Sequence, residues 1–291
     1  MHTSHTLRAF ALVTLFVSNF AFADWRLTIV APRSIAEAEQ RWTPFADYLS
    51  QELKTPVKLQ IVSAADVPKT IAKGDADFVM CAGTHAIYAE EMTKAKILAS
   101  LNTESGAHFA GVILVPKSSA LRTVEDLRGK RIVTSSKKSA GAYVFQMYYL
   151  MQRNIAEKDV TIVELNKQDN TFTALQKGLA DAAFVRTGVI EEMIAEGQIK
   201  ADEYVVLDAK ESNEGKFVYT TELYPEWFFF ALPSVPDAVT REVTQALLKI
   251  APDAPVSQTA RMRGFSTPLD LKSSRDAMRA LGIAPFQKNS G

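Results

Sequence analysis

One stretch of this sequence occurs twice, and the repeat limits the possible folds more than any other feature. In each copy a helical pattern ends at a Gly, an Asp opens a short apolar run suited to a buried strand, and a polar loop leads into another helix. Two copies predict two similar lobes, although one copy alone would be an ordinary helix-to-strand connection. Open α/β sheets bind ligands beyond the carboxyl ends of their strands, so each polar loop is a candidate ligand contact. The copies are Lys73 to Asp77 with strand Phe78 to Cys81 and loop Ala82-Gly83-Thr84, and Lys177 to Asp181 with strand Ala182 to Val185 and loop Arg186-Thr187-Gly188.

Residues 1–23 have the pattern of a secretory signal peptide. Arg8 precedes an apolar run from Ala9 to Phe22, and the small residues Ala21 and Ala23 suit signal peptidase. The run is short for a membrane span, and an uncleaved anchor is the alternative. The sequence therefore predicts a periplasmic protein, with cleavage after Ala23.

Charge and cysteine content argue against several classes of function. The chain has 33 basic and 33 acidic residues, and this balance gives no reason to expect nucleic acid or an anionic membrane as a partner. The single cysteine, Cys81, has no partner for an internal disulfide. Its place in an apolar strand favours a buried, inert thiol.

Strands alternate with helices along the rest of the chain, which predicts an α/β protein of two lobes. We expect mixed, mostly parallel sheets with helices on both faces and a ligand cleft between the lobes. Pro116 to Ser119 interrupts the pattern before the helix and strand signals of Val124 to Ile132, so we place the crossing into the second lobe there. The predicted domains are residues 24–115 for the first part of lobe 1, residues 116–216 for lobe 2, and residues 217–291 for the return to lobe 1 and a C-terminal tail.

Motifs for catalysis and for metal binding are weak. Ser135 to Lys138 matches the S-x-x-K pattern of serine acylases, but neither S-D-N nor K-T-G follows, so a serine-type hydrolase is a minor alternative and we expect no enzyme. His85 and His108 lie in no metal-binding spacing, and no glycine-rich nucleotide motif is present. We therefore expect neither a metal nor a cofactor.

A stronger signal for ligand binding lies in Thr134 to Gly141. Hydroxyls and backbone N–H groups gather there at the predicted start of a helix, where the macrodipole favours an anion, and two lysines lie alongside. Arg186, in the loop of the second repeat, can grip an oxyanion by two parallel donors. The alternatives are that Ser139 only caps the helix, that the lysines form a solvated face, and that Arg186 pairs with Glu191 or Glu192.

Two groups of motifs resemble known families. Val124 to Ile132, with Ser139-Ala140-Gly141 at the following helix, resembles the phosphate-, phosphite- and phosphonate-binding proteins of ABC importers, and this resemblance spans Asp24 to Phe286. A narrower similarity is to the periplasmic sensor domains of tetrathionate-type histidine kinases, which belong to the same superfamily. The resemblance implies a type II periplasmic binding-protein fold, non-catalytic capture of a small ligand in the cleft, and delivery to a transporter or signalling partner. The narrower similarity is carried by Phe184 to Glu191, Leu223 to Trp227 and the tail from Pro268 to Phe286.

The resemblance also implies ligand contacts in the polar loops of both lobes. The sequence departs from the phosphonate binders before the helix that ends at Gly178, where Lys167-Gln168-Asp169 replaces Gly-Ser-His. An acidic residue at that place argues against phosphonate itself as the ligand. The implied contacts are Pro32 and Ser34, Gly83 and Thr84 with Tyr88, Ser136, Ser139, Ala140 and Gly141, and Arg186 with Thr187.

We therefore predict a periplasmic solute-binding protein that captures a small anion, phosphonate-like, phosphate-like or another oxyanion, for the permease of an ABC transporter. The alternative is a stand-alone periplasmic sensor subunit that signals ligand occupancy to a separate membrane histidine kinase. We expect the protein to be monomeric and to bind no nucleic acid.

Overall fold

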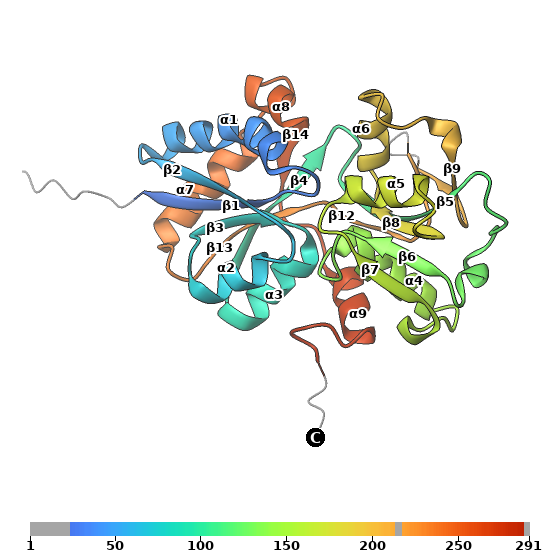
Figure 1. The fold of residues 1–291 in the computed structure, drawn as a ribbon. Coiled ribbons are helices and arrows are strands. Elements are labelled where there is room, and N and C mark those ends of the chain that lie inside the picture. The colour runs from blue at the N-terminus through green and yellow to red at the C-terminus, as the bar shows by residue number, and fades with distance from the viewer. Residues whose placement is uncertain (1–23, 213–216, 288–291) are drawn as a thin grey trace, which may run out of the picture.

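A computed structural model describes residues 24–212 and 217–287 of the chain (Figure 1). The predicted signal peptide lies outside these residues. The chain forms two lobes side by side, each built around one sheet with helices packed on it. The predicted two-lobed α/β architecture is therefore confirmed.

The first lobe contains a sheet in the order β14-β4-β13-β3-β1-β2. Its elements come from both ends of the chain: β1 (Trp25–Val30), α1 (Ile35–Leu53), β2 (Val57–Val62), α2 (Val67–Lys73), β3 (Phe78–Cys81), α3 (Gly83–Thr93) and β4 (Lys96–Thr103), then β13 (Phe228–Ala231), α7 (Asp237–Leu248), α8 (Pro255–Ala260) and β14 (Met262–Ser266).

The second lobe is one continuous stretch. Its sheet has the order β12-β5-β8-β6-β7, with β9 also paired to β5, and β10 and β11 form a separate two-stranded sheet. The elements are β5 (His108–Pro116), η1 (Val124–Leu127), β6 (Arg131–Thr134), η2 (Ala140–Val144), α4 (Phe145–Met151), η3 (Glu157–Asp159), β7 (Thr161–Glu164), α5 (Gln168–Gln176), β8 (Ala182–Arg186), α6 (Val189–Ala195), η4 (Ala201–Glu203), β9 (Tyr204–Val206), β10 (Lys210–Glu211), β11 (Val218–Tyr219) and β12 (Leu223–Pro225).

Helix α1 shows how the sequence sets local structure at the edge of the cleft. The Ser34 hydroxyl accepts a hydrogen bond from the Glu37 N–H at 3.1 Å and so caps the start of the helix. Trp42, Phe45 and Leu49 recur at helical spacing and are buried in the core of the first lobe. The cap and this buried face together fix the loop between β1 and α1, which lies at the cleft.

The repeated sequence unit has the same structure in both lobes, and its Asp has a specific role. The Gly of each copy follows its helix with a φ of +66°. Asp77 accepts a hydrogen bond from the backbone N–H of Arg26 at 2.8 Å, and Asp181 accepts one from the backbone N–H of Arg131 at 2.8 Å. Arg26 and Arg131 lie at the start of β1 and β6, the parallel neighbours of β3 and β8, so each Asp helps to set the register of two strands.

Both sheets are mixed, but parallel pairing takes a smaller share than we predicted. In the first sheet β1 is parallel to β2 and β3, whereas β13 is antiparallel to β3 and β4, and β14 to β4. In the second sheet β6 is parallel to β7 and β8, whereas β5 is antiparallel to β8, β9 and β12. The difference arises because β5 and β13 each follow a crossing between lobes and enter their sheet in the reverse direction.

The crossings themselves lie at different positions from those we predicted. Because β5 pairs with β8, residues 108–116 belong to the second lobe, and the first crossing follows β4 rather than Val115. Because β12 pairs with β5, the chain returns to the first lobe between Pro225 and Phe228 rather than at residue 217. The Glu226 N–H donates to the Ala107 carbonyl at 2.8 Å, which joins the two crossing segments.

Helix α9 (Lys272–Ala280) packs against both lobes rather than only the first. Leu271 and Met278 belong to the core of the first lobe, whereas Ala277 belongs to a core of the second. Arg275 forms ion pairs with Glu90 at 2.6 Å and Glu91 at 2.5 Å on α3. The helix therefore lies across the junction, at the lower edge of the molecule in Figure 1.

Candidate functional site

Two adjoining cavities lie in the cleft between the lobes. The smaller, of about 280 Å³, is lined by Ser135, Ser136 and Ser139, and we call it the serine pocket. The larger, of about 540 Å³, is lined by four arginines and we call it the arginine pocket. Pro32, Arg186 and Trp227 line both cavities, so these side chains form the boundary between them. The four arginines are Arg33, Arg41, Arg186 and Arg261.

The serine pocket is built on the loop after β6 and on the helix that starts at Ala140. The Ser136 carbonyl accepts a hydrogen bond from the Ser139 N–H at 3.0 Å, and the Ser136 hydroxyl accepts one from the Lys138 N–H at 3.1 Å. These bonds leave the Ser136 hydroxyl proton free for a ligand, and the Ser139 side chain makes no capping bond. The N–H groups of the first helical turn also lack intrahelical acceptors. The pocket thus gathers neutral hydrogen-bond donors at a helix start, where an anion is favoured.

Gly141 is required for this arrangement. A Cβ atom at this position would lie 2.5 Å from the Phe109 ring and 2.9 Å from Cβ of Arg186. Only Gly therefore lets the helix start approach β5 and β8 this closely.

The opposite wall of the serine pocket comes from the loops after β1, β2 and β3 of the first lobe. His85 lies there and is 5% exposed, and its Nε2 lies 3.1 Å from the Ala64 carbonyl. Burial lowers the pKa of His85 to about 4, so the imidazole is neutral at neutral pH and its Nε2–H donates to that carbonyl. His85 therefore holds the loop after β2 in place. We did not predict a contact from that loop, although it follows a parallel strand as the other cleft loops do.

Arg186 lies at the boundary of the two cavities and is paired with an acid that we did not predict. Its Nη2 donates to Oε1 of Glu226 at 2.7 Å, with the two side chains only 15% and 4% exposed. Its Nε donates to the Thr187 carbonyl at 3.1 Å, and its guanidinium carbon lies 4.4 Å from the centre of the Phe109 ring. The expected alternatives, Glu191 and Glu192, are therefore wrong as partners.

A group of ion pairs joins the two lobes along the arginine pocket. Arg33, in the loop after β1, donates to both oxygens of Asp169 at 3.0 and 3.1 Å and to both oxygens of Glu196 at 2.8 Å. Asp169 was the residue that argued against phosphonate. It does not line the serine pocket, and Arg33 neutralises its carboxylate, so this argument loses its basis. Its neighbour Gln168 does line the pocket and accepts a hydrogen bond from the Arg186 N–H at 2.9 Å.

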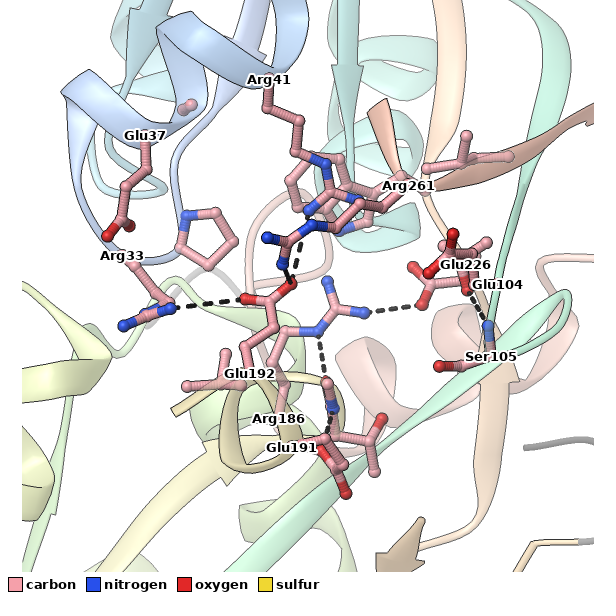
Figure 2. Close-up of a pocket in the computed structure, with 18 of the residues that line it drawn as sticks. Arg33, Glu37, Arg41, Glu104, Ser105, Arg186, Glu191, Glu192, Glu226 and Arg261 are labelled. Atoms are coloured by element: carbon pink, nitrogen blue, oxygen red, sulfur yellow. Dashed lines mark hydrogen bonds and ion pairs between the residues drawn. The ribbon is translucent and has the colours of Figure 1, made fainter. Parts of the chain in front are cut away.

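Glu192 is the centre of the remaining charges in the arginine pocket (Figure 2). Its carboxylate lies 3.6 Å from Arg41, 3.7 Å from Arg33 and 3.7 Å from Arg261. Glu191, next to it, instead accepts a hydrogen bond from the Gly188 N–H at 2.7 Å.

The structure brings together most, but not all, of the predicted site residues. Pro32, Ser136, Ser139, Ala140, Gly141 and Arg186 line the serine pocket, and Ser34 and Thr187 line the arginine pocket. Gly83, Thr84 and Tyr88 line neither cavity.

These three residues serve packing instead. A Cβ on Gly83 would lie 2.5 Å from Leu271 before α9, so the C-terminal segment covers this loop. Thr84 is buried, and Tyr88 packs half-buried against the core of the first lobe.

The lysines beside the predicted helix start do not enter either cavity. Lys137 pairs with Glu157 at 2.5 Å, and Lys138 Nζ donates to the Ala65 carbonyl at 3.2 Å across the cleft. Lys138 makes no hydrogen bond to Ser135 among the described residues, so the S-x-x-K match does not place a base on a serine nucleophile.

Three further features of residues 24–212 and 217–287 bear on function. Cys81 is fully buried, as predicted, and burial raises the pKa of its thiol. This part of the chain contains no group of three or more His, Cys, Asp or Glu side chains placed to hold a metal ion. None of its helices has the length and apolar character needed to cross a membrane.

Comparisons with known proteins agree with the two-lobed fold. The family model of the periplasmic substrate-binding protein of phosphonate ABC transporters matches residues 27–288. The tetrathionate sensor histidine kinase TtrS of Salmonella typhimurium is 27% identical over 253 residues, which are 84% of this chain and 43% of that protein.

Two solved structures share the fold. PhnD1 from Prochlorococcus marinus, in complex with methylphosphonate, has a TM-score of 0.75 at 16% identity and covers 89% of this chain and 98% of its own. A binding protein component of an ABC phosphonate transporter from Pseudomonas aeruginosa has a TM-score of 0.74 at 16% identity and covers 88% of this chain and 86% of its own. At these identities the structures establish the type II binding-protein fold.

Proposed function

Since this chain belongs to the family of periplasmic substrate-binding proteins of phosphonate ABC transporters, we propose that its serine pocket captures a small oxyanion for delivery to a transporter permease. The general function, periplasmic binding of a small solute, is that of the family. The ligand class and the residues that hold it are our proposal.

One observation carries the assignment. The hydroxyls of Ser136 and Ser139 and the start of the Ala140 helix converge on a cavity of about 280 Å³ that the first lobe closes from the other side. Hydroxyl and N–H donors preorganised at a helix start hold an oxyanion without bringing in a further charge. The cavity suits a compact ligand with one acid group and a small substituent.

Charge balance supports the same reading. Glu226 neutralises Arg186, the Asp66 carboxylate in the lining accepts a hydrogen bond from the Ser63 hydroxyl at 2.6 Å, and the nearby lysines bind elsewhere. Neutral donors and the helix dipole therefore supply most of the attraction for the ligand. Arg186 still lines both cavities, and Glu226 fixes the orientation of its guanidinium.

The proposal is tested on protein purified without refolding. Native mass spectrometry should identify a small oxyanion that co-purifies, and calorimetric titration of the stripped protein with methylphosphonate, methanesulfonate, phosphate and sulfate should give one site for at least one of them. Binding of only neutral or cationic solutes would overturn the assignment. Incubation with acyl and phosphoryl substrates should give no turnover above background.

A second candidate function is ligand sensing. The identity to TtrS over 84% of this chain favours it, and this chain spans 43% of that protein's length. In that role the closed form would be presented to a separate membrane histidine kinase, and tetrathionate joins the ligands to be titrated. Co-purification of the detergent-solubilised partner, with and without ligand, separates a permease from a kinase.

Export and oligomeric state belong to the same proposal. We propose that the signal peptide is cleaved after Ala23 and that the mature protein is a monomer. N-terminal sequencing of protein from the periplasmic fraction should begin at Asp24. Light scattering after size exclusion should give the mass of one chain.

A further inference from the structure

Arg41 and Arg261 of the arginine pocket are the least satisfied cations of the cleft. Arg41 Nε donates to the Ala260 carbonyl at 2.7 Å, but its Nη1 lies 3.6 Å from Glu192, beyond hydrogen-bond distance. Arg261 Nη1 lies 3.7 Å from the same oxygen of Glu192, and its guanidinium makes no hydrogen bond within the described residues. These two guanidinium groups therefore share one loosely held carboxylate, which also lies 3.7 Å from Arg33.

The other two arginines of this cavity are already paired with acids. Arg33 is held by Asp169 and Glu196, and Arg186 by Glu226. Burial lowers the pKa of Arg41, and the neighbouring Arg186 and Arg261 lower it further, whereas Glu192 and Glu226 raise it. Arg41, Arg186 and Arg261 carry three positive charges against the two negative charges of Glu192 and Glu226, so one positive charge remains in these immediate surroundings, although the whole wall contains more acids than arginines.

The remaining acids of the wall do not face this pair. Glu191 is bonded to the Gly188 N–H. Glu37 is exposed and points away from the Arg41 guanidinium, and Glu104 is exposed on the far side of the cavity (Figure 2).

We propose that Arg41 and Arg261 bind a second acid group of an elongated ligand whose first oxyanion lies in the serine pocket. This inference rests on the proposed function of the serine pocket. The two cavities meet at Pro32, Arg186 and Trp227, so one molecule can extend from the serines past Arg186 into the larger space.

The Glu192 carboxylate shows that an acid group is tolerated at this place. It belongs to α6, and its contacts of 3.6 and 3.7 Å with the two arginines are longer than hydrogen bonds. A carboxylate or sulfonate on a free ligand can approach either guanidinium fork more closely and make two parallel bonds, which a side chain fixed to α6 does not achieve here. The ligand class is therefore an extended molecule with an acid at each end.

Matched probes measure how much the second acid group contributes to the binding affinity. 3-Phosphonopropionate and 3-phosphonopropionamide have the same shape, and the far end is charged only in the first. The pair 4-phosphonobutyrate and 4-phosphonobutyramide adds one methylene to each. Calorimetric titration gives the ratio of affinities, acid over amide, for wild type, Arg41→Gln, Arg261→Gln and the control Arg263→Gln. Arg263 is exposed, lines neither cavity and lies two positions from Arg261.

In wild type and Arg263→Gln the acid of at least one pair should bind about tenfold more tightly than its amide, as for a new charge-assisted bond. Arg41→Gln and Arg261→Gln should each bring the ratio close to one while leaving the affinity for methylphosphonate unchanged.

Methylphosphonate binding that is lost in Arg41→Gln would mean damage to the fold, in which case the more exposed Arg261→Gln decides. A ratio near one in wild type, or a ratio unchanged in Arg261→Gln, overturns the second site alone. If no phosphonate binds, the second site is overturned, and the oxyanion assignment of the serine pocket falls with it only when methanesulfonate, phosphate and sulfate also fail to bind.

Discussion

The Arg186 guanidinium and the Glu226 carboxylate, 2.7 Å apart, form a nearly buried ion pair where the chain crosses between the lobes. The Glu226 N–H also donates to the Ala107 carbonyl in the other crossing segment, so the ion pair links the two crossing segments to the boundary between the two cavities. A ligand that contacts Arg186 thus contacts a group whose position depends on these crossing segments.

Removing one member of this pair should reduce stability as well as affinity. Arg186→Gln leaves the Glu226 carboxylate buried without its partner, and such a loss costs roughly 3–5 kcal/mol in the free energy of unfolding. The double variant with Glu226→Gln replaces the ion pair with two neutral amides and should be more stable than Arg186→Gln alone. Urea denaturation of the two single variants and the double variant measures the coupling, and strictly additive effects would contradict it.

Replacing the two serines on either side of the cleft by Ala should affect different properties, ligand affinity for Ser139 and stability for Ser34. Ser139→Ala removes a hydroxyl from the serine pocket and should weaken binding of the oxyanion about tenfold without changing the free energy of unfolding. Ser34→Ala removes the cap of α1 and should lower stability by about 1 kcal/mol without changing affinity. Titration and denaturation of both variants check this, and a loss of affinity in Ser34→Ala alone would reverse the assignment.

Arg33 should control how far the lobes close without a ligand. Arg33→Gln removes its ion pairs to Asp169 and Glu196, so the open form should gain population and the radius of gyration from small-angle scattering should increase. Arg26→Gln is the control, because it breaks an ion pair with Asp77 inside the first lobe. Equal scattering profiles for Arg33→Gln and Arg26→Gln would mean that these contacts do not govern closure.

Acidification should destabilise the protein through His85. Burial lowers the pKa of His85 from 6.5 to about 4 in the folded state, so between these values only the unfolded state binds the proton. The contribution of neutral His85 to the free energy of unfolding is fully present above pH 6.5. It is lost as the pH falls toward 4, at roughly 1.4 kcal/mol per pH unit. The free energy of unfolding at pH 7 and pH 5 should differ by less in His85→Gln than in wild type.

The sequence was most informative where structure is local. The repeated unit predicted two lobes because its Gly and its Asp act on the helix and strand beside them, and Asp77 and Asp181 are used in the same way. The lobe of β5 could not be predicted, since a strand buried on both faces shows the same apolar run in either sheet. The crossing near Val115 was misplaced for this reason.

The candidate site shows the same limit. Ser136, Ser139 and Gly141 could be found because they lie between a strand and a helix start, a pattern that is visible in the sequence. The partner of Arg186 is 40 positions away, and Arg33 reaches Asp169 across 136 positions, so neither pairing could be deduced without the fold. Gly83 and Thr84 looked equivalent to the second repeat, but the segment before α9 covers them.

Helix α9 packs against both lobes and so holds them together at one side of the molecule. It lies at one edge of the interface, whereas α1 and α6, with the ion pairs of Arg33 and Glu192, lie at the opposite edge (Figure 1). If the lobes rotate about an axis at α9, the displacement of each residue grows with its distance from that axis and is largest at the far edge. Such a rotation would therefore separate the two walls of the arginine pocket while the contacts of α9 hardly change. Spectroscopic labels on α1 and α6 would detect opening that the same labels on α9 and α4 would miss.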